Sequence, residues 1–117
     1  MPKMRNVNLY VDVDLTLVDH HGVLLPNVAE AMRVLYDGGC HLFLWSTGGA
    51  DYCRQVAERA GVAELFEAFL PKPDLYVDDM PSTIFNSPLF NVQEEEDWLP
   101  LAHKIVRDHV DPRERRR

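Results

Sequence analysis

The sequence lacks most features that mark membrane, secreted and redox-active proteins. No apolar run approaches the roughly 20 residues that a membrane-spanning helix needs, so no membrane partner is predicted. Cysteine occurs only at Cys40 and Cys53, which have neither metal-ligand nor redox spacing. The first residues also show no secretory pattern. These absences predict a cytoplasmic protein with reduced thiols.

Positive charge is scarce outside the last five residues. Four arginines and one glutamate in residues 113–117 contribute +3 to a formal net charge of −7, so residues 1–112 carry −10. An acidic body repels polyanions, which argues against a nucleic-acid partner. Terminal arginine clusters are commonly disordered, and residues 113–117 are predicted to form a basic, disordered tail.

The chain is also too short for a second domain. Its 117 residues, 46% of them hydrophobic, are enough for one domain with its own core, predicted over residues 1–112. A large domain that caps the substrate is therefore not expected. Internal repeats, linkers and low-complexity segments are absent as well.

Short apolar runs alternate with amphipathic helical patterns along the chain. The patterns predict strands at residues 6–13, 41–47 and 75–79, with 88–92 as a candidate fourth, and helices at 28–37, 50–60 and 98–110. Residues 17–25 contain the sequence His20-His21-Gly22 and predict a small hairpin, or flap, with solvated histidines. Trp45 and Trp98 are interpreted as core residues rather than as a binding platform. Alternating strands and helices predict an α/β fold with a parallel sheet in three layers.

Reactive side chains stand at the ends of three of these predicted strands: Asp12 and Asp14, then Ser46 and Thr47, then Asp78 and Asp79. Ligands of parallel sheets bind beyond the carboxyl ends of the strands. Two acidic clusters there suit a hard divalent cation, and Mg²⁺ prefers oxygen ligands. The hydroxyl residues precede Gly48 and a predicted helix, where backbone N–H groups can hold a phosphate.

The two acids of "DVDLT" need a reason to lie so close together. Like charges at this spacing are unfavourable without a cation, a shared proton or a chemical task. A carboxylate beside a metal can attack a phosphoryl group. Asp14 is close enough to protonate the leaving oxygen and later to activate water. The pattern therefore favours phosphoryl transfer with Asp12 and Asp14 as the catalytic pair.

Together these motifs resemble the haloacid dehalogenase (HAD) superfamily of phosphatases and related hydrolases. Residues 12–16, "DVDLT", match its first motif, Asp-x-Asp-x-Thr; Ser46 matches the second, Lys72-Pro73 the third, and residues 76–79, "YVDD", the fourth. The resemblance implies a Rossmann-like α/β/α core of the HAD-like type. It also implies a magnesium-dependent phosphomonoesterase that works through an aspartyl-phosphate intermediate.

The resemblance assigns a role to each matching residue. Asp12 would be the nucleophile and a metal ligand, and Asp14 the acid/base whose backbone carbonyl also binds Mg²⁺. Asp79 would ligate the metal directly, with Asp78 as close support. Phosphate binding would fall to four residues: Ser46, Thr47, Gly48 and Lys72.

Short intervals between the motifs resemble those of capless members of the superfamily. Only 31 residues separate Asp14 from Ser46, and 30 separate Thr47 from Asp78. Capless members often act on large substrates or use a neighbouring subunit as a lid, so a homo-oligomer is compatible with the sequence. The substrate is predicted to be phosphorylated, but no residue specifies its class.

The position of Lys72 leaves two alternatives open, because it precedes Asp78 by only six residues. If residues 75–78 formed an ascending strand, the lysine would start roughly 20 Å from the site, at about 3.3 Å per residue. Either residues 71–74 loop toward the site, or the phosphate-binding cation is missing.

Two other functions also stay open. One is a catalytically silent relative that binds a metal or a partner. The other is a phosphoacceptor domain of the response-regulator receiver type, although that pattern places an adjacent acidic pair first and a lysine last.

Overall fold

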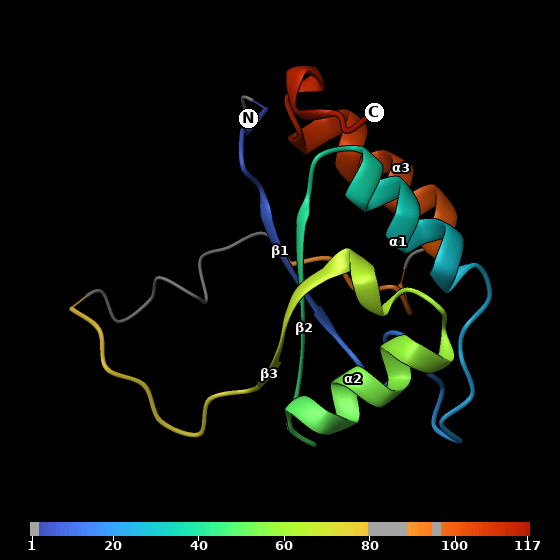
Figure 1. Cartoon of the computed structure of the whole chain (residues 1–117), viewed down its shortest axis with the longest axis vertical. Helices are drawn as coiled ribbons and strands as arrows, with labels where there is room; N and C mark the ends of the chain where they lie inside the picture. Colours follow the sequence, from blue (N-terminus) through green and yellow to red (C-terminus); the bar gives the residue numbers. More distant parts are fainter. Residues whose placement is uncertain (1–2, 80–88, 95–96) are drawn as a thin grey trace.

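The protein, described here by a computed structural model, folds around a parallel sheet of three strands (Figure 1). The structure describes residues 3–79, 89–94 and 97–117. The elements in chain order are β1 (Asn8–Asp12), α1 (Val28–Asp37), β2 (His41–Ser46), α2 (Ala50–Arg59), η1 (Ala63–Leu65), β3 (Phe66–Pro71), α3 (Trp98–His109) and η2 (Pro112–Glu114). The predicted α/β class and parallel sheet are confirmed.

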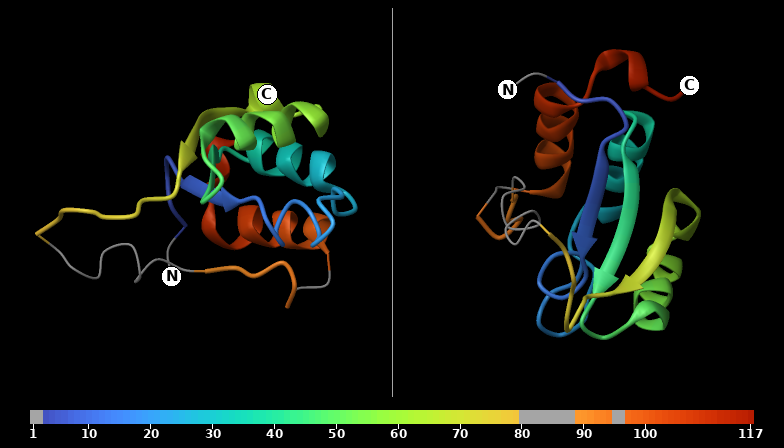
Figure 2. Two further views of the ribbon diagram at one scale, coloured as in Figure 1. Left: turned by 90° about the horizontal axis from the view of Figure 1, so that it is seen from below. Right: turned by 90° about the vertical axis from the view of Figure 1, so that its left-hand side faces the viewer.

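The α-helices of the described residues, α1, α2 and α3, lie on one side of the sheet (Figures 1 and 2). Helix α2 packs against β2 and β3, while α1 contacts β2 and α3. The described residues therefore form two layers, and the predicted third layer is not among them. Along β2, buried Leu42, Leu44 and Ser46 alternate with partly exposed residues. This period of two places one face of the strand on the core and the other away from it.

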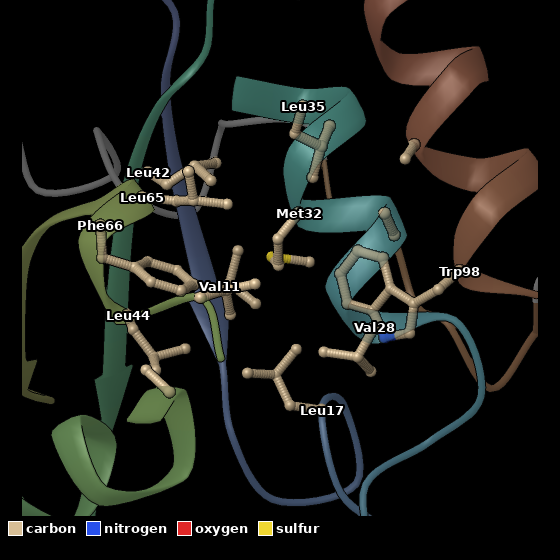
Figure 3. Packing of buried hydrophobic residues seen from close by; sticks show 14 of the residues in the cluster. Val11, Leu17, Val28, Met32, Leu35, Leu42, Leu44, Leu65, Phe66 and Trp98 are labelled. Atoms are coloured by element: carbon tan, nitrogen blue, oxygen red, sulfur yellow. The ribbon is translucent and has the colours of Figure 1, made fainter. Parts of the chain in front are cut away.

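The hydrophobic core fills the space between the helices and the covered face of the sheet (Figure 3). Val11, Leu42 and Leu44 project from the strands toward Met32 and Leu35 of α1. Each such side chain contributes about 1.5–3 kcal/mol when it is fully buried. Within the described residues, no helix is long and apolar enough to cross a membrane.

The third strand lies earlier in the chain than the sequence predicts. The prediction of a strand at residues 75–79 is wrong, because β3 is Phe66–Pro71 and pairs with β2 from Leu42 to Ser46. Residues 75–79 form no strand, and Leu75 and Val77 are 92% and 102% exposed. The candidate fourth strand is also wrong for residues 89–92, which are irregular, while residue 88 lies outside the described residues.

The basic C-terminal segment packs against the body of the protein, whereas the sequence predicted a disordered tail. The Arg116 guanidinium lies 4.1 Å from the centre of the Tyr36 ring and donates a hydrogen bond to the Cys40 carbonyl at 2.9 Å. Gly39 has a φ of +108°, and a Cβ there would lie 2.5 Å from the Glu114 carbonyl oxygen. The glycine therefore allows the segment to approach the turn between α1 and β2.

Candidate active site

The first motif forms a compact turn at the carboxyl end of β1. Asp12 is the last residue of the strand, and the N–H groups of Leu17 and Val18 both donate to the Val13 carbonyl, at 2.8 and 3.2 Å. Leu15 has a φ of +60°, a left-handed conformation that is unfavourable for a side-chain-bearing residue. The turn keeps Asp14 exposed at the same end of the sheet as Asp12.

Two side chains from later in the chain hold this turn in place. The Trp98 indole N–H donates to the Thr16 carbonyl at 2.6 Å, and the Gln93 amide donates to the Leu15 carbonyl at 2.9 Å. Trp98 is the first residue of α3 and is buried. The first motif is thereby tied to α3. The burial of Trp98 confirms its interpretation as a core residue.

Trp98→Phe is expected to destabilise the fold by about 1–3 kcal/mol, because it leaves the Thr16 carbonyl without its indole donor and removes buried volume. Urea denaturation followed by circular dichroism measures this change. Trp45→Phe, which alters a half-exposed ring, is the matched control and should cost less. Equal stability of Trp98→Phe and wild type would show that the indole does not anchor the turn.

Ser46 ends β2 and shapes the turn that follows it. Its side chain is fully buried, and its hydroxyl accepts a hydrogen bond from the Gly48 N–H at 3.0 Å. Its carbonyl accepts from the Lys72 N–H at 3.0 Å, which joins the ends of β2 and β3. Thr47 and Gly48 are exposed at the start of α2. A Cβ on Gly48 would lie 2.8 Å from the Tyr52 ring, so glycine fits this position best.

Lys72 lies beside Asp12, which resolves the question that its sequence position raises. Because β3 ends at Pro71, Lys72 directly follows the carboxyl end of the strand. Its Nζ is 3.3 Å from Asp12 Oδ1, and each of these side chains is 33% exposed. The same ammonium lies 5.6 Å from the centre of the Trp45 ring. The calculated separation of roughly 20 Å fails because its premise, a strand at residues 75–78, is wrong.

Tyr52 orients Asp14 from the first turn of α2, a role that sequence reasoning missed. Its hydroxyl donates a hydrogen bond to Asp14 Oδ1 at 2.7 Å. This hydrogen bond raises the pKa of Tyr52 above its ordinary value, and the partial burial of the ring raises it further. A tyrosine six residues after Ser46, near the predicted start of a helix, was the feature of the sequence that could have indicated this role.

The flap is a tight turn that is tied to α2. The Asp19 carboxylate accepts hydrogen bonds from the N–H groups of Val23 and His21, and these bonds lower its pKa. Arg59 donates to the Gly22 carbonyl at 2.9 Å. His20 and His21 are exposed, as predicted for solvated histidines.

Asp78 and Asp79 lie apart from this cluster. They belong to the segment that follows Lys72 and leads away from the sheet (Figure 1). Among the described residues, no group of three or more histidine, cysteine or acidic side chains is placed to hold a metal ion. The structure therefore brings together Asp12, Asp14 and Lys72 near the ends of the strands, but not the second acidic pair.

A cleft of about 570 Å³ extends from these residues along β1 toward α3. Its walls combine the polar site with aromatic and amide side chains, among them Tyr10, Asp12, Asp14, Trp45, Lys72, Phe90, Asn91, Gln93 and Trp98. Trp45 is thus part of a surface cleft as well as packing in the sheet, which its interpretation as a core residue did not foresee. The cleft is large enough for a substrate beyond the phosphate itself.

Comparison of this chain with protein families, with curated proteins and with solved structures finds no match in any of the three. The chemistry of the Asp12, Asp14 and Lys72 cluster is therefore the main indication of function. Its central feature is a carboxylate and an ammonium held together where the parallel strands end. In open α/β sheets this edge is where ligands bind.

Proposed function

We propose that the protein is a magnesium-dependent phosphomonoesterase of the HAD-like type that works through an aspartyl-phosphate. The observation that carries the proposal is the 3.3 Å separation between Lys72 Nζ and Asp12 Oδ1. Three neighbouring parallel strands end at Asp12, at Ser46 and just before Lys72. A carboxylate, a turn that exposes Thr47 and Gly48, and a cation thus meet at one edge of the sheet, in the order of the superfamily's first three motifs.

Each residue has a defined task in the proposed reaction. An Asp12 carboxylate oxygen forms a bond to phosphorus while the bond from phosphorus to the ester oxygen breaks. Asp14 gives its proton to that leaving oxygen, and then takes a proton from a water molecule. The water oxygen bonds to phosphorus while the bond from phosphorus to the Asp12 oxygen breaks, which releases phosphate and restores the Asp12 carboxylate. Lys72 faces the transferred phosphoryl oxygens and offsets their negative charge. Tyr52 holds the Asp14 carboxylate in position.

The donor atoms at the end of β1 suit Mg²⁺. This ion takes oxygen ligands and is commonly held by one or two carboxylates, with substrate phosphate and water completing its shell. Asp12 would supply a carboxylate oxygen and Asp14 its backbone carbonyl, with Asp79 and Asp78 as the further acids. When bound, the ion would supply positive charge that offsets the charge of the phosphoryl group.

The exposed segment after Lys72 offers a way to bring the second acidic pair to the site. Among the described residues β1 pairs with β2 alone, so its outer edge has no strand partner there. Leu75 and Val77 expose apolar side chains that a fold packed against the body would cover. We propose that the segment after Lys72 folds back toward this edge in the working enzyme without forming a strand at residues 75–78, so that Lys72 stays beside Asp12 while Asp78 and Asp79 come toward it.

Turnover of phosphomonoesters in the presence of Mg²⁺ is the direct test. Purified protein should release phosphate from at least one member of a panel that includes sugar phosphates, nucleotides and phosphopeptides, and EDTA should stop the release. If the protein instead only becomes phosphorylated by acetyl phosphate, the receiver-type alternative holds. If neither reaction occurs, the protein is a catalytically silent relative.

Lys72→Met should lower kcat by about 10²- to 10³-fold, the usual effect of removing one preorganised electrostatic group. Methionine keeps an unbranched side chain of similar length, so the change tests charge more than packing. Lys3→Met, at an exposed position near the N-terminus, is the matched control and should retain wild-type turnover. Near-normal turnover of Lys72→Met would remove the lysine from phosphate binding.

A further inference from the structure

The face of the sheet that no described helix covers carries an aromatic group beside the candidate active site. Tyr10 and Asp12 are two residues apart on β1, so their side chains leave the strand on the same face. Asp12 pairs with Trp45 and Tyr10 pairs with Phe43 on β2. The rings therefore continue directly from the catalytic carboxylate toward the beginning of the strands.

The rings pack on one another in a fixed arrangement. Tyr10 stacks on Phe43 with ring centres 4.8 Å apart and meets Trp45 edge-on at 5.1 Å. Despite these contacts, Tyr10 is 46% exposed. Tyr10 and Trp45 line the cleft, whereas Phe43 supports Tyr10 from outside it. A partly exposed ring that packs against two neighbouring rings is a good stacking platform, since that packing restricts its side chain before a ligand binds.

The spacing between the platform and the site limits what can bind there. Two residues of a strand span roughly 7 Å. If the phosphoryl group lies at Asp12 and Lys72, the part of the substrate that contacts Tyr10 must be separated from the phosphate by a spacer of about this length. A pentose between phosphate and base provides such a spacer. Asn91 and Gln93 line the same cleft. The Gln93 amide donates to the Leu15 carbonyl and Asn91 Oδ1 accepts from the Gln93 N–H, so each amide would meet the polar edge of a base with its other atom.

We infer that the substrate is a nucleoside monophosphate whose base stacks on Tyr10. This inference rests on the proposed function for the reacting end of the substrate, whereas the stacking itself does not depend on catalysis. The base is uncharged, so the acidic body of the protein does not repel it. Trp45 contributes the edge of the platform next to Lys72.

Calorimetric titration of the Asp12→Asn protein tests binding without turnover. Adenosine monophosphate and adenosine should both bind, and adding Tyr10→Leu should weaken each by about 5- to 20-fold, toward the lower end of the usual effect of losing a stacked aromatic ring. The affinity for glycerol phosphate, which has no ring, should change less than twofold. Phe69→Leu, which replaces a partly exposed ring of β3 outside the cleft and away from the Tyr10 group, is the matched control and should have a much smaller effect.

The outcomes separate this inference from the proposed function. If adenosine binds through Tyr10 but no phosphomonoester is hydrolysed, the stacking site stands and the enzymatic proposal falls. If phosphate esters are hydrolysed but adenosine does not bind, the nucleoside inference is overturned. It is also overturned if Tyr10→Leu weakens the binding of glycerol phosphate as strongly as that of adenosine monophosphate. Tighter binding of phenyl phosphate than of the nucleotide would overturn it as well.

Discussion

Replacing Asp12 with asparagine is expected to abolish phosphatase turnover, with a loss of about 10⁴-fold or more, as is typical when a nucleophile is removed. The amide has nearly the same shape as the carboxylate but cannot form the aspartyl-phosphate. Initial rates of phosphate release with Mg²⁺ measure the loss. Circular dichroism should show an unchanged fold, because Asp12 lies partly exposed at the end of β1.

Asp51→Asn provides the control for this change. It makes the same chemical substitution on an acidic side chain that is 89% exposed at the start of α2 and ion-pairs with Arg54. Its turnover should remain within about twofold of wild type, since exposed ion pairs contribute little. Wild-type turnover of Asp12→Asn, in a preparation free of contaminating phosphatase, would show that the nucleophile is another group.

Asp14→Asn is expected to slow turnover by about 10²- to 10⁴-fold, the usual contribution of a positioned acid/base. Both chemical steps should slow, because asparagine can neither protonate the leaving oxygen nor deprotonate water. A substrate with a good leaving group should rescue only the first step, since its departure needs little protonation. The variant should then accumulate a hydroxylamine-sensitive phosphoenzyme that the wild type does not accumulate.

Tyr52→Phe distinguishes loss of the acid/base from loss of its orientation. The change removes the hydrogen bond to Asp14 Oδ1 and leaves the carboxylate in place. One such bond contributes about 0.5–1.5 kcal/mol, which corresponds to a decrease in rate of roughly 2- to 10-fold. If Asp14→Asn behaves like Tyr52→Phe and traps no phosphoenzyme, Asp14 is not the general acid/base.

Local patterns in the sequence were sufficient to predict the elements whose formation depends mainly on hydrophobic period and residue type. The apolar run before Asp12 predicted β1, and helical spacing before the Gly38-Gly39 pair predicted α1. The grouping of Asp12, Asp14 and Ser46 at one edge also followed from sequence, because parallel strands present their carboxyl ends together.

The third strand could not be predicted from local pattern alone. Both Phe66–Pro71 and residues 75–79 contain short apolar runs, and either run could form a strand. The hydrogen-bonded register with β2 selects the first of them. Since β-strand formation depends on a partner and on burial more than on local propensity, this choice belongs to tertiary structure. The position of Lys72 beside Asp12 follows from it.

The sequence by itself determined the α/β class, the first two strands, the helices and the acids at the end of β1, because each depends on hydrophobic period and residue type. Tertiary structure alone decided three further features: the pairing of Lys72 with Asp12, the hydrogen bond from Tyr52 to Asp14, and the exposure of Tyr10 on the sheet face that no described helix covers. Each of these depends on the distance between residues far apart in the chain. Packing and strand register fix such distances, and no local pattern in a single sequence records them.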